Sequence, residues 1–136
     1  MDEGKFFSAK EEMPLLGLSI LVVNEDLGSR ERASKLLEEW GALVDKAEVA
    51  IEAIEAIKRY QYHAVLIDEE VACADSEDLT GAVKARSRNP NTAVIISGSL
   101  MITRNEAINS GADGYIEKPL DEIELLQSLI SSQQQH

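Results

Sequence analysis

Acidic, hydroxyl and basic side chains stand at the carboxyl ends of short apolar runs in this sequence. A carboxylate, a hydroxyl and a lysine brought together are groups that a phosphoryl-handling site needs, because such a site works mainly by positioning and charge stabilisation. We therefore expect Asp68, Ser97 and Lys118 to form one site, with Asp68 as the phosphoryl acceptor. The runs are LSILVVNED (18–26), HAVLID (63–68), TAVIIS (92–97) and GYIEKP (114–119).

Helical patterns separate these runs, so strand and helix alternate along the chain. A short second strand is expected over 42–47, and a weakly patterned helix over 101–109. Asp26 or Ser29 can cap the first helix, and Gly41 can end it in a left-handed conformation. The first helix and three later ones carry apolar residues three and four apart, the spacing of one helical face. These residues are Ala33, Leu36, Leu37 and Trp40; Ile51, Ile54 and Ile57; Leu79, Ala82 and Val83 within about 78–88; and, after Asp121, Ile123, Leu126, Leu129 and Ile130.

The strand patterns predict a doubly wound α/β/α sandwich. The first, third and fourth strands are continuous apolar runs, which is typical of a parallel sheet covered on both faces. Alternating strands and helices require right-handed crossovers, and ligands then bind outside the carboxyl ends of the strands. This architecture places the following residues on one rim: Asn24, Glu25, Asp26, Asp68, Ser97 and Lys118.

Length and composition fit one small domain. The 136 residues can bury one core, and a net charge of −12 argues against direct binding to nucleic acid or to an anionic membrane surface. Cys73 is the only cysteine, so we expect no intrachain disulfide and a reducing, cytoplasmic compartment. No apolar run approaches the length of a membrane span. We expect an N-terminal linker over 1–16, a folded domain over 17–131 and a polar tail over 132–136.

The combined spacing of the acids, Asp68, Ser97 and Lys118-Pro119 resembles the receiver domain of response regulators in two-component signalling. The resemblance covers about 17–131, and its opening is especially similar to receivers of hybrid sensor histidine kinases. It implies a flavodoxin-like, five-stranded parallel sheet of order 2-1-3-4-5. It also implies that Asp68 takes a phosphoryl group from a histidine kinase or a histidine phosphotransfer protein.

The same resemblance implies a magnesium site. Both the attacking carboxylate and the incoming phosphoryl group are anionic, so a Mg²⁺ ion must bridge them. Glu25, Asp68 and the backbone carbonyl of Glu70 would bind the ion directly, and Asn24 would reach it through water. Family members usually have an acid in place of Asn24 and Asp in place of Glu25. We therefore expect weak metal binding.

The remaining roles also follow from the resemblance. Lys118 would pair with one phosphoryl oxygen, and Ser97 would donate a hydrogen bond to another. Tyr115 corresponds to the aromatic residue that changes rotamer on phosphorylation and alters a partner-binding face. That face comprises the helix at 101–109 and the strand and helix that follow it, and it could also form a homodimer. The Lys118–Pro119 peptide bond is expected to be cis.

Other interpretations stay open at this point. Glu25 and Asp26 could simply cap a helix, and the acidic run 68–78 is expected to be a solvated loop that lacks the family's proline and glycine, with Ala72 and Ser76 in their places. Enzymatic activity would be slow at most, limited to self-phosphorylation from small donors and self-dephosphorylation. A pseudo-receiver that binds a protein without phosphorylation is the main alternative. A flavodoxin-like protein for a small ligand is a remote one, because the first loop is acidic and not glycine-rich.

Overall fold

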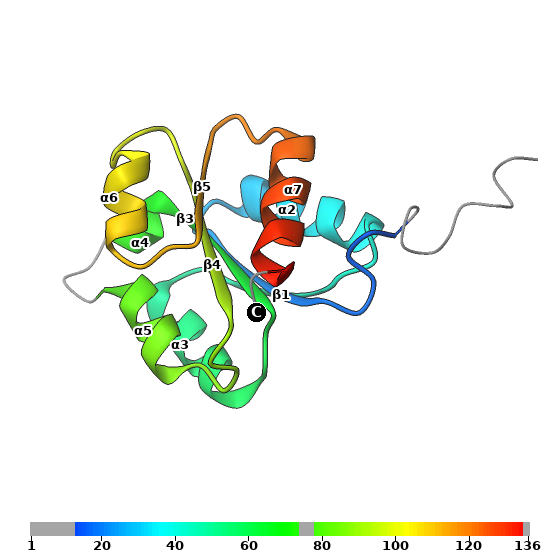
Figure 1. The fold of residues 1–136 in the computed structure, drawn as a ribbon, viewed down its shortest axis with the longest axis horizontal. Coiled ribbons are helices and arrows are strands. Elements are labelled where there is room, and N and C mark those ends of the chain that lie inside the picture. Colours follow the sequence, from blue (N-terminus) through cyan, green and yellow to red (C-terminus); the bar gives the residue numbers. More distant parts are fainter. Residues whose placement is uncertain (1–12, 74–77, 135–136) are drawn as a thin grey trace, which may run out of the picture.

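Five parallel strands run through the centre of the described chain in the order β2-β1-β3-β4-β5, which confirms the predicted topology (Figure 1). The computed structural model describes residues 13–73 and 78–134. Consecutive strands are joined by helices, as parallel pairing requires. The strands are β1 (Ser19–Val23), β2 (Leu43–Ala47), β3 (Ala64–Asp68), β4 (Ala93–Gly98) and β5 (Gly114–Glu117).

The three central strands are buried on both faces. Every residue of β3 and β4 is buried, and in β1 only Ser19 is partly exposed. Such strands need no polar alternation, so their sequences read as continuous apolar runs. The parallel register pairs Ile67 with Val23 and Asp68 with Ser97. The last residues of three runs are thereby brought to one edge of the sheet.

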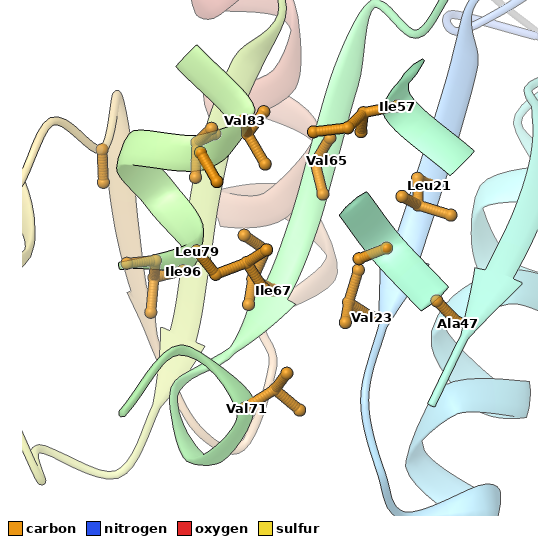
Figure 2. Packing of buried hydrophobic residues seen from close by; sticks show 14 of the residues in the cluster. Leu21, Val23, Ala47, Ile57, Val65, Ile67, Val71, Leu79, Val83 and Ile96 are labelled. Atoms are coloured by element: carbon orange, nitrogen blue, oxygen red, sulfur yellow. The ribbon is translucent and has the colours of Figure 1, made fainter. Parts of the chain in front are cut away.

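Helices cover both faces of the sheet. Alternate residues of β1 enter opposite cores: Leu21 and Val23 pack with α3, α4, α5 and α6, whereas Ile20 and Val22 pack with α2 and α7. Figure 2 shows the first of these cores, in which Leu79 and Val83 lie among the strand residues. The helices are α2 (Leu27–Glu39), α3 (Ala50–Arg59), α4 (Glu69–Cys73), α5 (Leu79–Arg86), α6 (Arg104–Asn109) and α7 (Glu122–Gln134).

Three local features agree with the predictions: the N-cap of α2, the residue that ends it and the peptide bond before Pro119. Asp26 is the N-cap of α2, and its carboxylate accepts a hydrogen bond from the Ser29 N–H. Gly41 follows the helix with φ of +98°, a conformation that favours glycine. The Lys118–Pro119 peptide bond is cis, as expected.

The predicted buried faces of α3 and α7 were wrong at one residue each. Ile51 is 61% exposed and Ile123 is 67% exposed. Two positions further on, Ala53 and Leu125 are fully buried. Two residues correspond to about 200° of rotation in an α-helix, so each isoleucine points away from the sheet.

The expected solvated loop after β3 was also wrong for its first part. Residues 69–73 form α4, in which Glu69 and Val71 are buried. Residues 74–77 of that acidic run, Ser76 among them, lie outside the described residues. The helix expected from 101 begins instead at Arg104, where Thr103 caps it.

The two ends of the described chain pack against the domain. Leu15 is fully buried, and its N–H donates to the carbonyl of Trp40. Helix α7 extends to Gln134, and Ser132 within it is buried. Residues 1–12 of the linker expected over 1–16, and residues 135–136 of the tail expected over 132–136, lie outside the described residues. No helix in the described ranges is both long and apolar enough to cross a membrane.

Candidate functional site

Asp68, Ser97 and Lys118 come together at the carboxyl edge of the sheet. Asp68 ends β3 and is 2% exposed, and its register partner in β4 is Ser97, also buried. Lys118 follows β5, and its N–H donates to the Gly98 carbonyl at 2.8 Å, which ties it to the end of β4. The Lys118 ammonium forms an ion pair with Oδ1 of Asp68. Three residues predicted from separate runs therefore share one site.

The environment of Asp68 is that of a buried carboxylate with one strong cationic partner. Its Oδ2 accepts a hydrogen bond of 3.0 Å from the Glu70 N–H at the start of α4. Among the described residues, Oδ1 accepts no hydrogen bond beyond its contact with the Lys118 ammonium. A buried charge needs such compensation, because removal from water is costly. Lys118 is partly exposed, so the ammonium links the buried carboxylate to the surface.

A cavity of about 540 Å³ opens beside this ion pair. Asp68, Ser97 and Lys118 line it together with Asn24 from the end of β1. Its other walls come from α2, from the segment after β5 and from the start of α7. They include cationic, acidic and apolar side chains: Arg32, Lys35, Glu39, Glu122, Leu36 and Leu120. A small group could therefore approach Asp68 from this side.

Two polar residues after β1, Asn24 and Asp26, serve the start of α2. Asn24 is almost fully buried, and its side-chain oxygen accepts from the Asp26 N–H at 2.9 Å. Asp26 caps α2, and the hydrogen bonds from Ser29 lower the pKa of its carboxyl. Glu25 is exposed and is not among the residues that line the cavity. Helix capping thus accounts for Asp26, while no contact among the described residues assigns a role to Glu25.

The candidate metal site has oxygen ligands but few charges. Within residues 13–73 and 78–134, no group of three or more Asp, Glu, His or Cys side chains is arranged to hold a metal ion. Asn24 occupies one position of the expected set, which leaves only Glu25 and Asp68 as carboxylates. Oxygen donors fit the preference of Mg²⁺, but a reduced charge weakens its binding. By donor type the residues present suit magnesium, but the missing acid and the absence of Glu25 from the cavity wall predict weak binding.

A second buried carboxylate, Glu69, is not among the residues that the sequence predicts for the site. It is 1% exposed and lies against β4 and the loop that follows β4. Its oxygens accept hydrogen bonds from the N–H groups of Ser99 at 2.6 Å and Met101 at 3.1 Å. Burial raises the pKa of Glu69, but these hydrogen bonds and one from Tyr115 outweigh burial and leave the pKa below its ordinary value. Nothing in the sequence distinguishes Glu69 from its exposed neighbour Glu70.

Tyr115, the expected switch residue, is buried inside the domain and hydrogen-bonded to Glu69. Its hydroxyl donates to Oε1 of Glu69 at 3.0 Å and accepts from the Leu100 N–H at 2.9 Å. Burial and the bond to Glu69 both raise the pKa of the Tyr115 hydroxyl. The Arg104 guanidinium lies 5.9 Å from the ring centroid and donates to the Tyr115 carbonyl. Contacts to the ring, the hydroxyl and the backbone carbonyl of Tyr115 therefore fix the position of this residue.

The fold and the site together define a known class of signalling domain. The sequence profile of the response regulator receiver domain matches residues 20–130. The chain therefore belongs to the response regulator receiver domains of two-component signalling.

Curated relatives agree with this assignment. The chemotaxis protein CheY of Halobacterium salinarum is 26% identical over 110 residues, which cover 81% of this chain and 92% of CheY. The transcriptional regulatory protein ZraR of Klebsiella oxytoca is 33% identical over 106 residues, 76% of this chain but only 24% of ZraR. The chain thus matches nearly all of one relative and about a quarter of another.

Solved structures share the same fold. The receiver domain of the Francisella response regulator 1452 has a TM-score of 0.75 and 26% identity, covering 88% of this chain and 98% of that one. The receiver domain of the sensor histidine kinase PA1611 from Pseudomonas aeruginosa has a TM-score of 0.76 and 21% identity, covering 87% and 98%. That second protein was solved with a magnesium ion coordinated in its active-site cleft. At its level of identity the likeness concerns the fold alone.

Proposed function

We propose that this chain is a phosphoacceptor in two-component signalling, in which Asp68 takes a phosphoryl group from a histidine of a partner protein. The observation that supports the proposal is the contact of the buried Asp68 carboxylate with the Lys118 ammonium, beside Ser97. The partner is a histidine kinase or a histidine phosphotransfer protein. The site works in the cytoplasm, where such partners present their phosphohistidines.

The transfer is a single displacement at phosphorus. A carboxylate oxygen of Asp68 attacks the phosphorus, and an acyl phosphate bond forms as the phosphorus–nitrogen bond breaks. The electron pair of the broken bond returns to the imidazole nitrogen of the partner. Lys118 faces the negative charge that spreads over the phosphoryl oxygens, and the Ser97 hydroxyl donates to one of them. Attack by water on the acyl phosphate later restores Asp68, which gives slow self-dephosphorylation.

Magnesium belongs to the proposal as a weakly bound cofactor. When bound, the ion would neutralise the charge of the acceptor and of the phosphoryl group together. Glu25, Asp68 and the Glu70 carbonyl are the residues that would hold it, with Asn24 assisting through water. The Asn24 oxygen already accepts from the Asp26 N–H, but an amide oxygen has a second lone pair for such a role.

The partner-binding face of the proposed receiver consists of α6, β5 and α7. Leu100, Met101 and Ile108 expose apolar side chains in α6 and the loop before it. Exposed apolar groups of this kind suit a protein partner or a second copy of the chain. Tyr115 lies in β5 between this face and the site, so any effect of Asp68 phosphorylation on the face would have to pass through it.

An amide NMR titration with beryllofluoride, a phosphoryl analogue, tests the proposal. We expect shifts around Asp68, Ser97 and Lys118 that require Mg²⁺ and are absent in Asp68→Asn. A folded wild-type protein that shows no response would contradict phosphoacceptor function.

That negative result would instead support the second candidate, a pseudo-receiver that binds its partner without phosphorylation. One observation favours this candidate: Asn24 stands where an acid would complete the magnesium site, and its oxygen is already engaged by the Asp26 N–H.

A further inference from the structure

Four donors converge on or beside the Glu69 carboxylate. The N–H groups of Ser99 and Met101 donate to it directly, and so does the Tyr115 hydroxyl. Between those two amides, the Leu100 N–H donates to the oxygen of the same Tyr115 hydroxyl. Successive backbone N–H groups of this kind form a concave anion site, and here the anion is a side chain of the same protein. We refer to Glu69, Tyr115 and residues 99–101 as the Glu69 cluster.

The loop in this cluster adopts a conformation that needs support. Leu100 has φ of +70°, which is unusual for a residue with a branched side chain. Its N–H bond to Tyr115 and the two bonds of its neighbours to Glu69 hold the loop in place. The loop conformation, the tyrosine position and the buried carboxylate are therefore interdependent.

Because Gly98 has no side chain, the Glu69 carboxyl group can occupy the space beside it. A Cβ atom added at Gly98 would overlap the Glu69 carboxyl group, and the carboxyl group would have to leave its hydrogen bonds. Glu69 directly follows the acceptor Asp68, and Gly98 directly follows its register partner Ser97. Glu69 and Gly98 thus each lie one residue beyond a residue of the phosphoryl site.

Movement of Tyr115 out of the domain would be opposed by this arrangement. The tyrosine would lose both hydrogen bonds of its hydroxyl, and Glu69 would remain buried with one donor fewer. A buried charged group that loses a donor is strongly disfavoured.

We propose that Glu69 is a positioning residue that holds Tyr115 and the loop 99–101 in one buried arrangement whether or not Asp68 is phosphorylated. The face formed by α6, β5 and α7 is then preset for its partner. This link to phosphorylation rests on the proposed function. Asp68 accepts a phosphoryl group, and the partner-binding face keeps its conformation. Release of Glu69 would make that face respond.

The first test needs no phosphoryl analogue. Amide hydrogen exchange at Ser99 and Met101 is compared in wild type, Glu69→Leu and the control Glu55→Gln, which removes an exposed carboxylate from α3. We expect exchange at both amides to become at least about tenfold faster in Glu69→Leu, because a hydrogen bond to a charged group is lost, and to be unchanged in the control. Unchanged exchange in a folded Glu69→Leu protein would overturn the proposal.

Gly98→Ala tests the same contact from the opposite side. The added methyl group should displace the Glu69 carboxyl group and accelerate exchange at the same two amides, although every hydrogen-bonding side chain is retained. If Glu69→Leu does not fold, this variant still tests whether Glu69 holds the loop 99–101. Exchange as slow as in wild type would contradict the inferred contact.

The second test adds beryllofluoride and Mg²⁺ and follows the Tyr115 ring signals. In wild type we expect shifts near Asp68 but none at Tyr115, whereas in Glu69→Leu the shifts should reach Tyr115. A wild-type Tyr115 response as large as that of Glu69→Leu would refute the restraint. If Asp68 responds in neither protein, the proposed phosphoacceptor function fails, and the exchange measurement still decides the role of Glu69.

Discussion

The carboxylates of Asp68 and Glu69, adjacent in sequence and both almost fully buried, have entirely different partners. Asp68 faces the Lys118 ammonium and the cavity, whereas Glu69 accepts hydrogen bonds from the loop after β4 and from Tyr115. The chain changes from β3 to α4 between them. One residue step therefore separates the proposed phosphoryl acceptor from the carboxylate that holds the loop and Tyr115.

Removal of the Lys118 charge should destabilise the protein. Lys118→Ala leaves Asp68 buried without its cation, and we expect a loss of about 1–3 kcal/mol in the free energy of unfolding at neutral pH. Urea unfolding measures it, with Lys58→Ala on the exposed face of α3 as the control. In an Asp68→Asn background the same substitution should have a smaller effect, since the ion pair is already absent. Equal losses in both backgrounds would mean that the two side chains do not interact.

Phosphoryl incorporation should require Asp68 as the acceptor. Asp68→Asn keeps the shape of the side chain but removes the nucleophilic charge, so intact-mass measurement after incubation with a phosphorylated partner should show no acyl phosphate. Glu55→Gln should be modified to the same extent as wild type. Incorporation that persists in Asp68→Asn would assign the acceptor to another residue.

Magnesium affinity should follow the number of carboxylates at the end of β1. Asn24→Asp adds a third acid, and we expect Mg²⁺ to bind about tenfold more tightly because charge count tunes such sites. Glu25→Gln should weaken binding more than Asn24→Ala does. NMR titration with Mg²⁺ gives the order of affinities, and the reverse order for the last two variants would exchange the direct and the water-mediated ligand.

The N-cap of α2 should lose strength in acid. The pKa of Asp26 is lowered by the Ser29 hydrogen bonds, so the charged form is favoured in the folded state. Its contribution to stability is present above the unfolded pKa of about 3.9 and is lost as pH falls through the lower folded pKa. The Ser29 amide shift, followed against pH, should report this titration. Asp26→Asn should keep the cap and abolish the pH dependence.

Two isoleucines of α3 offer a matched test of the observed helix orientation. Ile54→Ala removes a buried side chain and should cost about 2–5 kcal/mol, whereas Ile51→Ala should change stability by less than about 0.5 kcal/mol. Chemical denaturation of the two variants measures the difference. Similar losses would mean that the helix is rotated relative to the structure described above.

The site and the fold class were predictable because they depend on local features. Continuous apolar runs identify buried parallel strands, and residues at the ends of such strands must meet at one edge of the sheet. Asp68, Ser97 and Lys118 could be assigned in this way. Resemblance to receivers supplied the strand order and the cis peptide bond before Pro119, both of which the structure confirmed.

Helix orientation and the role of Glu69 could not be obtained from the sequence alone. Apolar spacing of three or four allowed Ile51 and Ile123 to be counted with the buried face, and only packing on the sheet excluded them. Glu69 and Glu70 are identical side chains in an acidic run. The turn from β3 into α4 directs the first against Gly98 and leaves the second exposed.

By itself the sequence determined the parallel α/β class and the meeting of Asp68, Ser97 and Lys118 at one edge of the sheet, because short apolar runs indicate which strands are buried and where they end. Only the tertiary structure decided which carboxylate holds Tyr115. That contact joins residues 46 positions apart, through a space left by the missing side chain of Gly98. Hydrogen bonds across such separations depend on the relative placement of whole elements, which local patterns do not specify.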